Sequence, residues 1–246
     1  MKVKIALTLT LVSLFLSNLP VYSDTYQNIA SKPVPKRDTP KRDTPKRDPK
    51  RTSGVERGGC DIATQDLSVD NLVALVPEKG EMLVASIAPS FWFYSPYTPT
   101  SSLKAKFTLR DENSQLVTEL ADIELPKTAG IFSIQIPQPL KKSTSYRWYF
   151  SIECDADHPS KNPRVQGWIR VIEPTIPLNN QLKQDSSPAQ TATLYMQAGL
   201  WNDALTLVTT QREVSANAKA LWLELLKVEN LDAIAAKPIL SCCTPR

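Results

Sequence analysis

Apolar and polar residues alternate along the middle of the chain, from Cys60 to about Pro174. In residues 146–154 an aromatic or apolar side chain stands at every second position, with polar or charged residues between most of them. Residues 104–110 and 132–136 repeat this pattern over shorter lengths. Alternation with a period of two is typical of strands that bury one face. The pattern therefore predicts β-strands in all three segments.

Shorter apolar runs predict further strands, and residues that favour turns separate them. These runs are 72–76, 82–88, 91–94, 116–120 and 165–172. Several short strands divided by regular turns are typical of an all-β sandwich. We therefore expect a mainly β domain over residues 60–175, built as an antiparallel, Ig-like β-sandwich.

The spacing of apolar residues changes to a helical one after Pro188. Trp201, Ala204, Leu205 and Val208 stand at positions i, i+3, i+4 and i+7, which places them on one face of a helix. Ala198-Gly199 marks a break before this helix, and a further helix carries Leu221, Trp222, Leu225 and Leu226. The spacing is faintly similar to one tetratricopeptide unit, but no second copy is present. We expect residues 188–241 to form a helical tail packed on the sandwich.

The first 23 residues have the organisation of a signal peptide. Lys2 and Lys4 precede an apolar run from Ile5 to Leu19, and Ser23 offers a small residue for cleavage. The run is shorter than the ~20 residues that a membrane-spanning helix needs. The sequence therefore predicts cleavage after Ser23 and export to the periplasm or the extracellular space. The alternative is an uncleaved membrane anchor.

Residues 24–59 are predicted to be a disordered, basic, proline-rich linker. A Pro-Lys-Arg-Asp unit occurs three times, and nine Lys or Arg residues stand against three Asp in residues 32–51. Proline at every fifth position prevents helix formation and favours an extended chain. The Lys-Arg pairs are Lys36 and Arg37, Lys41 and Arg42, and Lys46 and Arg47. They predict contact with an anionic envelope polymer or membrane surface, or else a spacer that its charge keeps extended.

The overall net charge of +4 therefore conceals a basic linker and a mildly acidic remainder. Residues 52–246 carry eighteen Lys or Arg against twenty-one Asp or Glu. Because export places the chain where nucleic acid is scarce, we do not expect a nucleic-acid partner.

Aromatic residues on the predicted strands raise the question of carbohydrate binding. Trp92 and Tyr94 share one face of their strand, and Trp168 stands on the last strand beside Arg170. Rings that faced solvent could stack on sugars, as in a carbohydrate-binding module. The alternative is that the partner sheet and the helical tail cover them.

Four cysteines in an exported chain predict disulfide bonds. They are Cys60, Cys154, Cys242 and Cys243. Consecutive Cα atoms lie only ~3.8 Å apart, below the usual range for a disulfide, which argues against a bond between the last two. Both other connectivities would join the tail to the β domain.

No constellation of catalytic residues stands out, and we expect neither a cofactor nor a clear metal site. His158 is the only histidine, and Asp155 and Asp157 beside it are weak candidates for a metal ion. Phosphate-binding loops, zincin motifs and nucleophile elbows are absent from the sequence. We therefore favour a non-enzymatic function over an enzymatic one. A hydrolase with paired carboxylates remains as an alternative, because it needs only two acidic residues.

Several sequence blocks together resemble the domain-of-unknown-function 928 family of exported, mostly cyanobacterial proteins. The blocks are Arg57–Cys60, Leu72–Pro77, Pro89–Tyr94, Tyr146–Asp155, Gly167–Ile169 and Gly199–Leu205. The resemblance implies export and a shared fold, and it assigns no catalytic residue. The resulting expectation is a non-enzymatic envelope or periplasmic protein that binds or scaffolds an unidentified protein or glycan partner.

Overall fold

A computed structural model describes residues 47–53, 71–98, 103–184 and 186–243 of the chain. The chain divides into two compact units, 1–36 and 37–246, and every described residue belongs to the second. The predicted signal peptide and most of the predicted linker lie outside the described residues.

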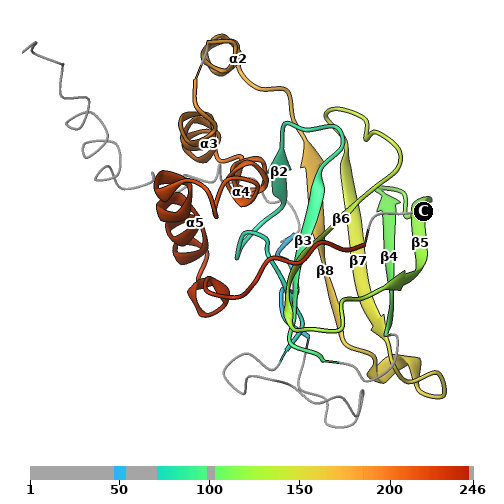
Figure 1. Cartoon of the computed structure of the whole chain (residues 1–246). Helices are drawn as coiled ribbons and strands as arrows, with labels where there is room; N and C mark the ends of the chain where they lie inside the picture. Colours follow the sequence, from blue (N-terminus) through green and yellow to red (C-terminus); the bar gives the residue numbers. More distant parts are fainter. Residues whose placement is uncertain (1–46, 54–70, 99–102, 185, 244–246) are drawn as a thin grey trace, which may run out of the picture. The chain divides into compact units, whose positions relative to one another are not determined.

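The described part is mainly β, with two sheets and four α-helices (Figure 1). The larger sheet has the strand order β2-β8-β7-β4-β5, and the smaller has the order β1-β3-β6. The strands are β1 (Val73–Ala74), β2 (Met82–Val84), β3 (Ser90–Ser95), β4 (Lys104–Asp111), β5 (Leu116–Glu124), β6 (Gly130–Gln135), β7 (Ser145–Glu153) and β8 (Arg164–Val171). All eight predicted strands are therefore present.

One pairing differs from the expected antiparallel arrangement. β2 runs parallel to β8, with Met82 opposite Ile169 and Val84 opposite Val171. The period of two reports which face of a strand is buried, and it carries no information about the direction of the neighbouring strand.

Aromatic side chains from both sheets meet in one hydrophobic core. Phe93 of β3 stacks on Phe150 of β7 with ring centroids 4.2 Å apart, and Phe91 lies 4.7 Å from Phe107 of β4. Trp148 of β7 is 1% exposed and meets both β3 rings edge-on. Because the core takes the inward residues of β4, β7 and β8, the alternate residues of these strands point outward.

The helices are α2 (Ile176–Leu182), α3 (Pro188–Gln197), α4 (Trp201–Thr209) and α5 (Ala216–Val228). The predicted break lies at Gly199, whose φ of 75° ends α3 before α4 begins. α2 was not predicted, because its seven residues bury only Leu178 and so show no apolar period. None of these helices in the described ranges has the length and apolar character needed to cross a bilayer.

The helical tail packs on the β domain, as expected, and covers the outer side of β3. The indole Nε1 of Trp92 donates to Thr206 Oγ1 at 2.9 Å, and the Asn202 side-chain amide donates to the carbonyl of Ser90 at 3.1 Å. Figure 1 shows α4 beside β2, with α3 and α5 next to it.

The chain after the helices returns to the smaller sheet. Ile239 pairs in parallel with Ile131 of β6. The Leu240 amide donates to the carbonyl of Ile131 at 2.7 Å, and the Ile131 amide donates to that of Pro238 at 2.8 Å. The last described residues therefore lie along the free edge of β6.

Residues 47–53 also belong to the folded unit, although they fall inside the predicted linker. Lys50 pairs with Gln166 of β8, and Thr52 pairs with Val73 of β1, so this short segment reaches both sheets. The prediction of disorder is wrong for these residues. It rested on their lack of apolar side chains, whereas backbone atoms and the polar side chains of Arg47, Asp48 and Arg51 supply the bonds.

Candidate functional site

The outer face of the five-stranded sheet carries a cluster of arginine and aromatic side chains. On β7, Arg147 and Tyr149 alternate with buried residues and so point outward. Arg164, Trp168 and Arg170 do the same on β8. The register places Arg147 directly opposite Trp168. Neighbouring strands thus bring cationic and aromatic groups together on one surface.

These side chains form an alternating series of charges and rings. The guanidinium of Arg47 lies 4.4 Å from the ring centroid of Trp168, and that of Arg147 lies 5.8 Å from the same ring. Arg147 is also 5.1 Å from the Tyr149 centroid, and Arg164 is 5.0 Å from it. All four distances fall within the range of cation–π attraction. We call the series Arg47, Trp168, Arg147, Tyr149 and Arg164 the arginine ladder.

The two arginines near each ring reach it from different places on the sheet. Arg47 belongs to the segment that pairs with the β8 edge away from β7, whereas Arg147 comes from β7 itself. Along β7, Arg147 precedes Tyr149 by two residues, while Arg164 lies opposite Ser151, two residues after it. The five groups therefore follow one path across the sheet.

The middle of this face has more positive charge than its carboxylates balance. Among the described residues, no carboxylate lies within ion-pair distance of Arg110, Arg147, Arg164 or Arg170. Arg47 is the exception, because it contacts Glu81 at 2.8 Å and Glu112 at 3.5 Å. Guanidinium groups that lack carboxylate partners are suited to binding carboxylate, sulfate or phosphate groups.

A family model covering Domain of Unknown Function (DUF928) matches residues 52–239, about three quarters of the chain. The chain belongs to the DUF928 family. This confirms the resemblance that the sequence blocks predicted. No match to the chain was found among the curated proteins.

Within the DUF928 domain, Trp92 and Tyr94 are not ligand-stacking residues. Trp92 is 7% exposed and Tyr94 is 0% exposed. The helical tail covers Trp92, and the Lys237 ammonium lies 5.9 Å from the Tyr94 ring. The carbohydrate-stacking interpretation is therefore wrong for these two rings, and the alternative that the tail covers them is correct.

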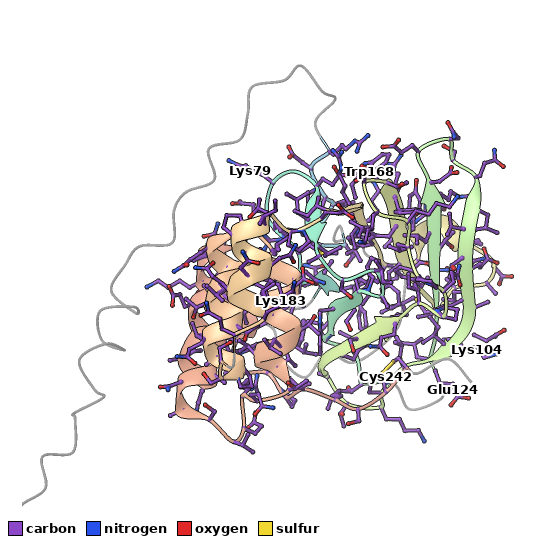
Figure 2. All side chains as sticks on the ribbon, turned by 90° about the horizontal axis from the view of Figure 1, so that it is seen from above. Lys79, Lys104, Glu124, Trp168, Lys183 and Cys242 are labelled. Carbon is purple, nitrogen blue, oxygen red and sulfur yellow. A yellow bond between two sulfur atoms is a disulfide. The ribbon has the colours of Figure 1, made fainter. Side chains whose placement is uncertain are left out.

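Trp168 does lie on the outer face, but the guanidinium groups of Arg47 and Arg147 lie over its ring, 4.4 and 5.8 Å from the centroid. Figure 2 shows Trp168 on the side of the β-sheets, away from Lys183, which lies at the end of α2 on the helical side. The ring therefore positions Arg47 and Arg147, and a sugar that stacked on it would first have to displace one of them.

The sequence identified only part of the arginine ladder. It singled out Trp168 and, as a linker charge, Arg47; Lys36, Arg37, Lys41, Arg42 and Lys46 lie outside the described residues. Arg147, Tyr149 and Arg164 were missed. The signal for them is the alternation of arginine and tyrosine at the outward positions of a strand that faces Trp168.

Asp155, one of the two weak candidates for binding a metal ion, forms hydrogen bonds within its own loop. Its carboxylate accepts the His158 amide at 2.8 Å and lies 3.2 Å from His158 Nδ1. The backbone hydrogen bond from His158 is the main reason that the pKa of Asp155 is lowered. The described residues contain no group of three or more His, Cys, Asp or Glu that could hold a metal ion. Neither Asp155 nor Asp157 is thus part of such a group.

Acidic residues line two of the cavities among the described residues. One, of about 650 Å³, lies beside β5 and is lined by Glu119, Asp122 and Glu124, of which Glu119 and Asp122 are ion-paired with Lys106 and Lys104. The hydrogen bond from Lys104 lowers the pKa of Asp122, which is opposite to what a general acid needs. The smaller cavity, between the tail and β3, is lined by a single acidic residue, Asp203.

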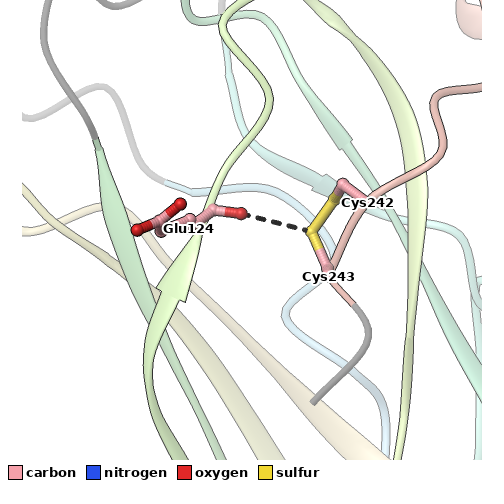
Figure 3. Close-up of a disulfide and its surroundings, with 3 residues drawn as sticks. All are labelled: Glu124, Cys242 and Cys243. Atoms are coloured by element: carbon pink, nitrogen blue, oxygen red, sulfur yellow. Dashed lines mark hydrogen bonds between the residues drawn. A yellow bond between two sulfur atoms is a disulfide. The ribbon is translucent and has the colours of Figure 1, made fainter. Parts of the chain in front are cut away.

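Cys242 and Cys243 are bonded to each other, which corrects the expected connectivity (Figure 3). Their Cα atoms are 3.7 Å apart, and Cys243 has a φ of 68°, a left-handed conformation that turns the chain sharply. Cys243 Sγ lies 3.7 Å from the carbonyl oxygen of Glu124 at the end of β5. The argument from Cα spacing failed because the turn at Cys243 brings the two side chains together. Cys154 is also disulfide-bonded, while Cys60 lies outside the described residues.

Proposed function

We propose that this chain is an exported, non-enzymatic protein that binds an anionic polymer of the cell envelope through the arginine ladder. The observation that carries the proposal is the set of outward arginines on β7 and β8 that aromatic rings position and that no described carboxylate neutralises. Export rests on the signal-peptide pattern of residues 1–23.

Stacking prepares these arginines for binding. A guanidinium that lies over a ring keeps its N–H groups at the edge of its plane, where they form paired hydrogen bonds with an oxyanion. The rings also restrict the side chains before the ligand arrives, which reduces the entropy lost on binding. The upstream Lys-Arg pairs would add a longer-range attraction that salt screens.

The architecture behind this surface supports the proposal. We take the two sheets as the layers of a β-sandwich, because their inward residues share one core. Its parallel β2–β8 pair departs from an all-antiparallel Ig-like arrangement. A rigid layer under β7 and β8 holds the outward residues at constant spacing.

The test is the affinity of residues 24–246 for heparin, a sulfated glycan, measured by calorimetry at several salt concentrations. We expect affinity to fall as salt rises and to drop at least about tenfold in the double variant Arg147→Gln/Arg164→Gln, because each charge-assisted hydrogen bond contributes roughly 1.5–3 kcal/mol.

The matched control is Lys183→Gln/Lys219→Gln, which removes the same charge from exposed positions in the helical tail region, one just after α2 and one in α5. It should lower affinity less than about threefold, as a change in net charge alone would. An equal loss in both double variants would refute the ladder as the site. Binding to an uncharged glycan of the same length, unaffected by salt, would favour the carbohydrate-binding module instead.

A further inference from the structure

The smaller cavity contains a carboxylate that has no cationic partner. It has a volume of about 230 Å³ and lies between α3, α4 and the chain that leads from β2 into β3. None of the described residues that line it is Lys, Arg or His, and Asp203 is its single acidic residue. In the described part of the chain, no basic side chain lies within ion-pair distance of Asp203. The lining of this cavity therefore carries one negative charge and no positive charge.

Backbone amides hold the Asp203 carboxylate in place and leave part of its capacity unused. Its Oδ2 accepts the Ala85 amide at 2.9 Å, and its Oδ1 accepts the Ser86 amide at 3.1 Å. A carboxylate can accept about four hydrogen bonds. Burial raises the pKa of Asp203, because a buried charge without a counter-charge is unfavourable. A cation bound in the cavity would remove much of that cost.

A second acceptor in the cavity wall lacks a donor. Asn202 lines the cavity next to Asp203 and is only 2% exposed. Its Nδ2 donates to the carbonyl of Ser90 at 3.1 Å, and this bond fixes the orientation of the side-chain amide, because a carbonyl can only accept. No described donor reaches its Oδ1. Since a buried acceptor without a donor is costly, a ligand that brings N–H or O–H groups would stabilise this wall.

The negative charge and the unpartnered acceptor together favour a primary ammonium group as the ligand. An ammonium carries a positive charge and three N–H donors, and it has no acceptor. The pKa of the Tyr195 hydroxyl, also in the lining, is raised first by burial and then by the charge of Asp203, so this residue stays neutral beside the carboxylate. The volume is below the ~300–1,000 Å³ of sites for drug-sized ligands, so the cavity suits a small molecule.

We propose that this cavity binds the primary ammonium group of a small amine. The ammonium pairs with the Asp203 carboxylate, and its remaining N–H groups bind acceptors of the wall, Asn202 Oδ1 among them. The inference is independent of the arginine ladder, because no ladder residue lines the cavity.

Four small ligands test this by NMR titration of residues 24–246 near neutral pH. The Ala85 and Ser86 amides donate to Asp203, so their chemical shifts report binding in this cavity. n-Butylamine and glucosamine present the same ammonium group on an alkyl chain and on a sugar. Tetramethylammonium has the same charge without an N–H donor, and glucose is the sugar without the amine. We expect both amines to shift the two amides saturably, and the other two ligands to bind at least about tenfold more weakly.

The comparison of the two amines identifies the source of the ammonium group. Tighter binding of n-butylamine would indicate an alkylamine as the natural ligand, and tighter binding of glucosamine would indicate an amino sugar. Either result supports the proposal.

Asp203→Asn tests the role of the charge. This variant keeps an acceptor of similar size, and its affinity for n-butylamine should fall at least about tenfold. Glu224→Gln is the matched control, because it removes a half-buried carboxylate from α5 outside the cavity, and it should change the affinity less than about twofold. If Asp203→Asn does not fold, the comparison of n-butylamine with tetramethylammonium on the wild type decides.

Three results would overturn the proposal. Tetramethylammonium that binds as tightly as n-butylamine would show that charge alone is sufficient. Glucose that binds as tightly as glucosamine would indicate a site for a neutral sugar. Amines that leave the Ala85 and Ser86 amides unshifted would bind elsewhere or not at all. None of these results affects anion binding by the arginine ladder, which heparin tests separately.

Discussion

Arg147 and Arg164 owe their positions to aromatic rings, with no described carboxylate holding either side chain. An exposed cation–π contact contributes only about 0.5–1 kcal/mol. Arg147 contacts two rings, so its position is better defined than that of a typical surface arginine. At the residue scale, the rings therefore set where positive charge is presented while leaving the guanidinium edges open to a ligand.

Gly167, the neighbour of Trp168 in sequence, faces the core where there is no room for a side chain. A Cβ at this position would lie 2.6 Å from Cζ2 of the Trp148 ring and 3.1 Å from Cβ of Pro49. We expect Gly167→Ala to lower the free energy of unfolding by about 1–3 kcal/mol, because the surrounding core must shift to accept a methyl group. Urea denaturation measures this change.

Gly80 provides the comparison for Gly167→Ala. Nothing lies within 4 Å of its hypothetical Cβ, but its φ is 76°. Gly80→Ala should therefore lower the free energy of unfolding by only about 1 kcal/mol, through backbone strain. Equal effects of the two substitutions would contradict the crowding at Gly167.

At the scale of elements, Asp203 attaches α4 to the chain that follows β2. Its carboxylate accepts the amides of Ala85 at 2.9 Å and Ser86 at 3.1 Å. Burial raises the pKa of Asp203 despite these hydrogen bonds, so the folded state favours the protonated acid more than the unfolded state does. The contact therefore contributes most to the stability of the fold at low pH.

Replacing Asp203 by asparagine should expose this dependence on pH. As pH rises above 3.8, the ordinary pKa of the group, the unfolded chain loses the proton first, and the stability of the wild type falls until the folded pKa is passed. Asp203→Asn does not titrate, so the stability of the wild type relative to this variant should decrease across that window. Thermal unfolding of both proteins from pH 3 upward measures the difference, and a constant difference would contradict the raised pKa.

The sequence predicted where the strands and helices lie better than it predicted which segments pair with each other. Alternation and short apolar runs together identified all eight strands, and helical spacing identified α3, α4 and α5, because these patterns record which side chains are buried. Pairing depends on backbone groups, which every residue has. The parallel partner of β2 and the backbone bridges of residues 47–53 therefore left no signal in the side-chain pattern.

The same limit explains what was missed in the candidate site. Trp168 was singled out as a possible ligand-stacking ring with its exposure left open, whereas its contact with Arg47 joins residues more than a hundred positions apart. That contact depends on the bridge between Lys50 and Gln166, which is made by backbone atoms alone. The short helix α2 left no pattern for a similar reason, since most of its side chains face solvent.

Across the molecule, backbone hydrogen bonds hold the end of the chain on the β domain. Ile131 bonds to Pro238 and Leu240, while the bond between Cys242 and Cys243 closes within the tail itself. A disulfide between adjacent residues restricts the unfolded chain very little, in contrast to one that spans a long loop.

Serine in place of both Cys242 and Cys243 should therefore lower the free energy of unfolding by only about 1 kcal/mol, against about 4 for a bridge from the tail to the β domain. Amide exchange at Leu240 should remain slow, because its partner is the carbonyl of Ile131. Denaturation and exchange measured on the same samples test both statements. A loss near 4 kcal/mol together with fast exchange would show that the cysteines do hold the tail.

Gly130→Ala is the contrasting change. A Cβ at Gly130 would lie 2.5 Å from the Leu240 side chain and 2.9 Å from the Pro238 carbonyl. It should speed amide exchange at Leu240 more than the double cysteine variant does, because it crowds the docked segment directly. Similar exchange in the two variants would contradict this role of Gly130.

The attachment of residues 47–53 also determines how the domain responds to mechanical force. A pull on the chain before Arg47 first loads its ion pair with Glu81 and then the two backbone bonds between Lys50 and Gln166. The load then reaches the smaller sheet, first through the bond from the Ala74 amide to the Arg51 carbonyl and next through the bond from Ser53 to Leu72. Because the contacts are loaded one after another, the segment peels away in small steps. Each residue released would add up to ~3.3 Å of chain, so we expect the attachment to lengthen under tension and to dock again when the tension falls.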